Sequence, residues 1–186
     1  MEWARTTAQE LLGLALPQRW AHTQGVAAAA AGLTGEFTAP QATILIAAAW
    51  LHDVGYAPAV AATGFHPLDG AHYLRGQGFP AQLVSLVAFH TGAQFEADRR
   101  GLSAKLNEFP APDPVLLDAV TCADMTTSPA GVPITAVARL ADIFDRYSPG
   151  TLVSDAVHTS APDLLAAVSR CERRVQFKSQ RRILRN

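Results

Sequence analysis

The chain has 186 residues, of which 49% are hydrophobic and 17% charged, and its formal net charge at pH 7 is −1. This length suits one domain with a sizeable core, and the balanced charge excludes binding of nucleic acid through a global basic field. The two cysteines, Cys122 and Cys171, lack CxxC spacing, which favours reduced thiols in a cytoplasmic protein over a disulfide framework. The longest apolar stretch, 42–51, is too short to span a bilayer, so no membrane partner is expected.

The pattern of hydrophobic residues predicts an all-α fold. Alanine and leucine dominate, and the alternating β-branched runs typical of strands are missing. Proline recurs where apolar-periodic segments begin, and proline is tolerated in a first helical turn but not inside a helix. In chain order we expect helices near 3–14, 17–32, 39–53, 67–77, 80–90, 96–108, 114–124, 133–147 and 162–183.

The segment Ser148-Pro149-Gly150 marks the predicted domain boundary. We expect a helical domain over 1–147, a linker over 148–161 and a peripheral C-terminal helix over 162–186, packed on the same domain. That last helix is basic, which indicates a solvated face or, as the alternative, a contact with nucleic acid or a partner. Its basic residues are Arg170, Arg173, Arg174, Lys178, Arg181, Arg182 and Arg185. The apolar faces around Trp3 and Trp20 are interpreted as core or as the surface of a homodimer.

The consecutive pair His52-Asp53 follows the apolar run 44–51, where a buried helix is expected to end. A carboxylate buried there without a partner would cost several kcal/mol, roughly, so it requires a metal or a matching cation. Imidazole and carboxylate groups are common ligands of first-row divalent metals. His22 upstream and Asp124 downstream would complete most of one coordination sphere, and His66 and His90 could add a second metal.

The motifs around these residues resemble the HD-domain superfamily of metal-dependent phosphohydrolases. The resemblance covers roughly residues 15–147 and is most similar to the YqeK-like branch, small proteins that split diadenosine tetraphosphate symmetrically. It implies a compact helical bundle with the metal site in a central cleft. The matching segments are Arg19-Trp20-Ala21-His22-Thr23-Gln24-Gly25-Val26, Leu51-His52-Asp53-Val54-Gly55, His66-Pro67-Leu68-Asp69-Gly70-Ala71, His90-Thr91 and Ala123-Asp124.

The resemblance also implies roles for individual residues. Four of them match the family's metal ligands: His22, His52, Asp53 and Asp124. The histidines of a second metal in dinuclear members correspond to His66 and His90. Such mixed ligands suit one or two ions of Mn, Fe, Co or Zn better than Mg alone.

The expected chemistry is attack of a water molecule on phosphorus. A divalent metal would lower the pKa of that water towards neutrality, and Asp53 is the catalytic residue expected to orient it. Arg19 and Arg139 are the first candidates for substrate binding, each with a surface salt bridge as the alternative role. Tyr56 stands where many relatives carry a phosphate-binding lysine after His-Asp, and Phe89 replaces a frequent histidine before His90.

We therefore predict a metal-dependent phosphohydrolase acting on a nucleotide or a related phosphoester or phosphoanhydride. Its partner would be a small phosphorylated molecule. One alternative is a diiron HD-type oxygenase, because the same ligand types serve both chemistries. The other is a non-catalytic sensor that binds metal and nucleotide. Arg75 and Lys105 are weaker candidates for phosphate contact, His72 is expected at the surface or behind the ligands, and His158 is assigned no role.

Overall fold

The computed structural model describes residues 2–183, with side chains described to residue 177, and this part of the chain is all-α as predicted. It contains no strand, only an isolated bridge between Thr127 and Pro133. Short 3-10 turns connect several helices: η1 (Thr34–Glu36), η2 (Val54–Tyr56) and η3 (His90–Gly92). The helices are α1 (Glu2–Leu12), α2 (Pro17–Leu33), α3 (Ala39–Leu51), α4 (His66–Gly76), α5 (Ala81–Phe89), α6 (Ala93–Arg99), α7 (Ser103–Leu106), α8 (Pro114–Met125), α9 (Ala136–Arg146) and α10 (Leu152–Ile183).

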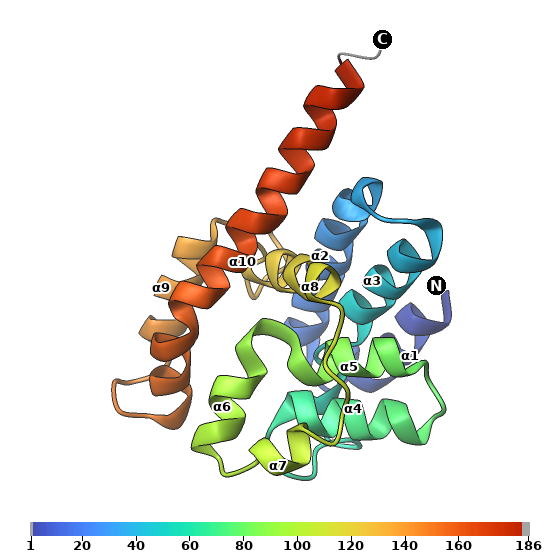
Figure 1. Cartoon of the computed structure of the whole chain (residues 1–186). Coiled ribbons are helices and arrows are strands. Elements are labelled where there is room, and N and C mark those ends of the chain that lie inside the picture. Colours follow the sequence, from blue (N-terminus) through green and yellow to red (C-terminus); the bar gives the residue numbers. More distant parts are fainter. Residues whose placement is uncertain (1, 184–186) are drawn as a thin grey trace.

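Helix α8 lies in the middle of the bundle and contacts α2, α3, α5, α9 and α10. Helix α2 packs on α3, α4 packs on α5, and α10 packs against α6, α8 and α9. Figure 1 shows the C-terminal end of α10 extending beyond the other helices. The core between the helices is rich in alanine and leucine, such as Ala48, Leu51, Leu86 and Leu116, all essentially inaccessible to solvent. The alanine side chains let the helices approach closely around α8.

Local sequence explains where the main helices begin. Thr38 and Gln41 form a capping box at the start of α3, and the Asp113 carboxylate accepts hydrogen bonds from the first N–H groups of α8. Pro17 and Pro114 occupy first-turn positions, where the missing N–H costs no helical hydrogen bond. Six predicted helices agree with the structure to within two residues at each end.

The predicted single helix over 96–108 is wrong, because two short helices, α6 and α7, occupy this region. Gly101 has a φ of +68°, and the amides of Gly101 and Leu102 donate to the carbonyls of Asp98 and Ala97. This Schellman arrangement ends a helix at a left-handed glycine. The periodic apolar pattern continues across the break, so it did not reveal the end of α6.

Two further helix starts differ from prediction. Pro133 belongs to a loop that pairs with Thr127, and α9 begins only after Thr135, whose hydroxyl caps the Ala138 amide. The predicted linker over 148–161 is wrong for most of its length, because α10 begins at Leu152 and contains Pro162 in its interior. Pro162 is exposed, so water can satisfy the carbonyl that lacks a helical N–H partner.

The two tryptophans interpreted as core or as dimer surface lie in different environments. Trp20 contacts Trp50 and packs against the core, whereas Trp3 stacks on Phe79 and stays 41% exposed, so a homodimer remains a prediction.

Among the basic residues of α10, two bind the Asp118 carboxylate and are not free for a partner: Arg170 and Arg174. The side chains of Lys178, Arg181 and Arg182, and the whole of Arg185, lie outside the described residues. No described helix is long and apolar enough to cross a membrane.

Candidate metal centre

The six predicted ligand residues lie together at the centre of the bundle, in two groups of three. One group consists of His22 from α2, His52 at the end of α3 and Asp124 from α8. The other consists of Asp53, His66 from the start of α4 and His90 from η3. Within each group the potential ligand atoms lie within 4.8 Å of one another. The structure therefore brings together residues that are up to about a hundred positions apart in sequence.

Asp53 connects the two groups. Its Oδ2 lies 3.2 Å from Nε2 of His52 and 3.9 Å from Nε2 of His22, both in the first group. Its Oδ1 lies 3.4 Å from Nε2 of His66 in the second group. One carboxylate oxygen thus faces each group, which is the arrangement of a carboxylate that can bridge two metal ions.

Backbone carbonyls orient three of the histidine rings. Nδ1 of His22 lies 3.0 Å from the Ser128 carbonyl, Nδ1 of His52 lies 2.8 Å from the Ala49 carbonyl, and Nδ1 of His90 lies 2.7 Å from the Val87 carbonyl. A carbonyl only accepts, so each Nδ1 carries a proton and each ring turns its Nε2 towards the site. Histidines that bind metals are held in this way in many proteins.

The Nε2 atoms are placed to bind a cation. Nε2 of His52 is buried without a hydrogen-bond partner in the described part of the chain. Nε2 of His22 lies 3.0 Å from the Asp124 Oδ1, and two acceptors so close require a proton or a metal between them. Nε2 of His66 lies 3.2 Å from Nε2 of His90. Bonds of about 2.1 Å to a shared metal place two nitrogens roughly 3 to 3.4 Å apart.

The pKa shifts in the centre differ among its members. Burial opposes ionisation of Asp53, but the neighbouring His52 and Arg19 charges outweigh it and hold the pKa of Asp53 well below its usual range. Burial likewise opposes charge on His52, yet the adjacent Asp53 carboxylate raises the pKa of that imidazole. Burial lowers the pKa of His66 and of His90, despite the attraction of Asp53, which leaves both as neutral ligand groups. The donor set and its field therefore fit one or two divalent metals.

Close backbone approaches set the positions of these ligands. A Cβ on Gly55 would lie 1.9 Å from the His66 carbonyl oxygen, so the turn after His52-Asp53 rests directly on the start of α4. A Cβ on Gly25 would lie 2.4 Å from the Gly131 carbonyl oxygen, where α2 meets the loop after α8. Side chains at these points would separate the elements that carry the ligands.

Comparison with known proteins agrees with this geometry. The sequence model of a family described as HD domain matches residues 19–150, which include all six residues of the two groups. The chain belongs to the HD-domain family. Neither a curated protein nor a solved structure matches it.

Four of the six potential ligands line a cavity of about 120 Å³, the HD cavity: Asp53, His66, His90 and Asp124. Both arginines predicted to bind substrate line it. Arg19 donates to Oδ2 of Asp53 at 2.8 Å, and its guanidinium carbon lies 4.1 Å from the centre of the Tyr56 ring. Arg139 is buried, and its Nε has no hydrogen-bond partner among the described residues. Their role in substrate binding remains a prediction.

Tyr56 organises the wall of the cavity. Its ring stacks on His66, with centroids 3.9 Å apart and planes 16° apart, while Arg19 covers the other face. Arg19, Tyr56 and His66 thus form a continuous stack beside Asp53. The tyrosine thus holds the Arg19 guanidinium beside Asp53.

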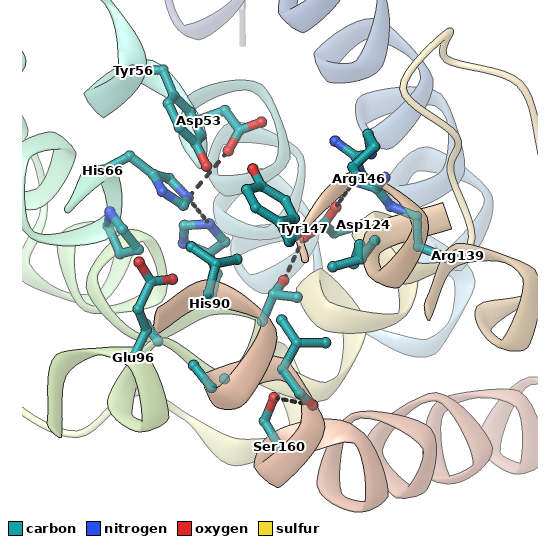
Figure 2. A pocket seen from close by; sticks show the side chains of 18 of the residues that line it. Asp53, Tyr56, His66, His90, Glu96, Asp124, Arg139, Arg146, Tyr147 and Ser160 are labelled. Carbon is teal, nitrogen blue, oxygen red and sulfur yellow. Dashed lines mark hydrogen bonds and ion pairs between the residues drawn. The ribbon is translucent and has the colours of Figure 1, made fainter. Parts of the chain in front are cut away.

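Sequence reasoning missed several residues that line the HD cavity. Arg146 lies two helical turns after Arg139 on α9, and both donate to the Asp142 carboxylate, at 2.8 and 3.0 Å. The seven-residue spacing on an amphipathic helix is a signal that could have identified Arg146. Glu96 and Tyr147 also line the cavity, and no sequence signal distinguished them (Figure 2).

The first turns of α10 form an apolar wall of the same cavity, through Val153, Ala156 and Val157. The sequence predicted a linker here, so this wall was not anticipated. His72 lies outside the HD centre, half-buried beside Arg75 and Phe109, and His158 contacts Phe144. Neither Arg75 nor Lys105 lines the cavity.

Proposed function

We propose that this HD-domain protein is a metal-dependent phosphohydrolase that cleaves a nucleotide or a related phosphoester or phosphoanhydride. The supporting observation is the carboxylate of Asp53, which faces both groups of potential ligands and lies at a cavity lined by Arg19, Arg139 and Arg146. A cavity with metal ligands on one wall and arginines beside them suits a phosphoryl group, whose oxygens require positive charge during transfer. The same cations favour the hydrolase over the oxygenase interpretation.

In this proposal six side chains would hold one or two ions: His22, His52 and Asp124 in one group, and Asp53, His66 and His90 in the other. Metals bound there would supply a nucleophile at neutral pH by lowering the pKa of water. Asp53 would orient that water, and Arg19 fixes the position of the carboxylate by donating to its Oδ2 at 2.8 Å. Thr91 fixes Asp124 by donating to its Oδ2 at 2.6 Å.

The arginines would bind the phosphoryl oxygens. Arg139 is held by Asp142 through one terminal nitrogen, and another terminal nitrogen lies 3.9 Å from Asp124, so the guanidinium is already placed beside the ligands. Arg19 retains an exposed fraction of 26% and can reach a bound phosphate. Preorganised charges of this kind require no rearrangement when negative charge develops on the substrate.

The deciding experiment is a chromatographic hydrolysis panel with added Mn, comparing wild type with Asp53→Asn. The substrates include nucleoside mono- and triphosphates, simple phosphomonoesters and diadenosine tetraphosphate, with all products resolved. We expect turnover of at least one substrate and a loss of at least roughly a hundredfold in Asp53→Asn. Asp155→Asn, which changes an exposed carboxylate on α10 outside the cavity, serves as the matched control.

Two results would contradict the proposal. The first is absence of turnover of every phosphate compound by folded protein loaded with metal. The second is equal turnover by wild type and Asp53→Asn. Bound iron together with oxygen-dependent turnover of a phosphate-free molecule would support the oxygenase instead.

A further inference from the structure

Glu96 is a carboxylate in the cavity that the proposed hydrolysis does not use. It lies on α6, lines the cavity, and its side chain is only 19% exposed. Arg100, one turn later, approaches a single oxygen of this carboxylate: its Nε and one terminal nitrogen lie 2.7 and 2.6 Å from Oε1. In the described part of the chain, Oε2 has no hydrogen-bond partner. One oxygen is thus anchored and the other is available to a ligand.

The charges around the cavity are separated. Figure 2 shows Glu96 on one side of the cavity, and Arg139 and Arg146 on the other side, near Asp124. A phosphate group is attracted to the arginine side and repelled by the carboxylate. The Glu96 side therefore suits a part of the substrate that carries no phosphate.

Both sides line the same cavity, with Glu96 on one side and Asp124, Arg139 and Arg146 on the other. A phosphoryl group beside Asp124 and the arginines would bring the attached atoms towards Glu96.

We propose that Glu96 determines specificity by accepting a hydrogen bond from a hydroxyl of the leaving group. The substrate class would be phosphoesters of hydroxyl-bearing alcohols, such as a ribose or another polyol. This inference rests on the proposed phosphohydrolase function. Arg100 holds Oε1, so an analogue that lacks the hydroxyl leaves Oε2 without a partner in the complex and is bound less well.

Two substrate pairs test the proposal with wild type and Glu96→Ala. One pair is a ribonucleoside monophosphate and its dideoxy counterpart, and the other is glycerol phosphate and propyl phosphate. Wild type should prefer the hydroxyl-bearing member of at least one pair by roughly 10- to 100-fold in kcat/KM. Glu96→Ala should abolish this preference and leave turnover of the hydroxyl-free member within about threefold. The pair that shows the preference identifies the leaving group as nucleoside or simple polyol.

Three variants separate recognition from structure. Asp98→Ala removes an exposed carboxylate from the same helix and should leave the preference intact. Arg100→Ala keeps the carboxylate but frees it, so the preference should fall only in part. Glu96→Gln retains a neutral acceptor and should also keep part of the preference. Thermal unfolding of each variant checks that α6 remains folded.

The proposal fails if Glu96→Ala lowers turnover of both members of a pair equally, or if the wild-type preference survives the substitution. It also fails if wild type turns over both members of each pair equally. Hydrolysis of a phosphoanhydride such as diadenosine tetraphosphate without turnover of any phosphoester would overturn this inference and leave the proposed function standing. Absence of turnover of every phosphate compound would overturn both.

Discussion

At the scale of single residues, the candidate metal centre depends on groups that hold the potential ligands in place. Three histidines donate from Nδ1 to backbone carbonyls, so their Nε2 atoms point to the site. Thr91 holds Asp124 through its hydroxyl and is the one described non-glycine residue with a positive φ, of 47°. A β-branched residue in this conformation costs roughly 1–2 kcal/mol. The strain is retained at a residue that fixes a potential ligand.

Two substitutions at Thr91 separate the hydrogen bond from the strain. Thr91→Val and Thr91→Gly both remove the hydroxyl, so both should weaken Mn binding by roughly 10- to 100-fold. Only glycine relieves the positive φ, so Thr91→Gly should be more stable to unfolding than Thr91→Val by about 1 kcal/mol. Metal titration calorimetry and urea unfolding measure the two effects. Unchanged Mn affinity in both variants would show that the hydroxyl does not support the metal site.

At the scale of elements, close contacts between backbones decide where the ligands lie. Helix α2 and the loop after α8 meet at Gly25 and Gly131, and the same loop supplies the Ser128 carbonyl that orients His22. A Cβ on Gly131 would lie 2.2 Å from the Ala21 carbonyl oxygen, so both glycines are required for the approach. The contact links a helix position to the orientation of a potential ligand.

We predict that Gly25→Ala destabilises the protein by roughly 1–3 kcal/mol, because its Cβ would overlap the Gly131 backbone. It should also weaken Mn binding, since the Ser128 carbonyl would move away from His22. Gly32→Ala on the same helix is the control: its Cβ meets nothing within 4 Å, and the change should stabilise the protein by up to about 1 kcal/mol. Calorimetric melting and Mn titration check both variants, and equal effects of the two substitutions would contradict the assignment.

The contact between α8 and α10 predicts a pH effect on stability. Burial opposes ionisation of Asp118, but hydrogen bonds from Arg170 and Arg174 outweigh it and lower the pKa of Asp118. A lowered pKa in the folded state stabilises the protein above the unfolded value of about 3.9, and this stabilisation is lost as the pH falls through the lowered pKa.

Asp118→Asn should therefore cost about 1 kcal/mol at pH 7, a modest figure because both arginines are partly exposed. The difference from wild type should shrink as the pH falls below about 4. Urea unfolding from pH 7 to pH 3 measures the trend, with Asp155→Asn as the control for loss of one exposed carboxylate. A difference that stays constant with pH would exclude the ion pair as its cause.

At the scale of the whole molecule, the six potential ligands come from elements that span most of the chain. They join the start of the fold at α2 to its centre at α8, and α10 closes the cavity from outside. Binding of metal to the folded state alone would stabilise all these elements together. The fold and the site are therefore expected to respond to metal as one unit.

Metal removal should lower the thermal unfolding midpoint of wild type. Free Mn at a hundred times its Kd adds about 2.7 kcal/mol, which corresponds to a shift of roughly 5–10 °C for a chain of this size. Scanning calorimetry with Mn and with EDTA measures the shift. Asp124→Asn should show a smaller shift, whereas Asp155→Asn should match wild type. Identical midpoints with and without metal in wild type would contradict a metal site that joins these helices.

Much of the fold could be predicted because its signals are local. Apolar periodicity, caps and first-turn prolines place α2, α3 and α8 within two residues of their observed ends. Prediction failed at Gly101 because the apolar pattern continues through this glycine. It failed at Pro133 and Pro162 because a proline is compatible with more than one environment. A single residue type cannot specify its conformation when neighbouring elements decide it.

The sequence by itself determined the helical class and the chemical identity of the potential ligands, because periodicity and functional groups belong to the chain. Only the tertiary structure decided that Asp53 faces two groups, that Tyr56 holds Arg19, and that Glu96 lies across the cavity from Arg139. These relations depend on how α2, α4, α6 and α9 pack, and packing is set by contacts between distant segments that no local pattern encodes.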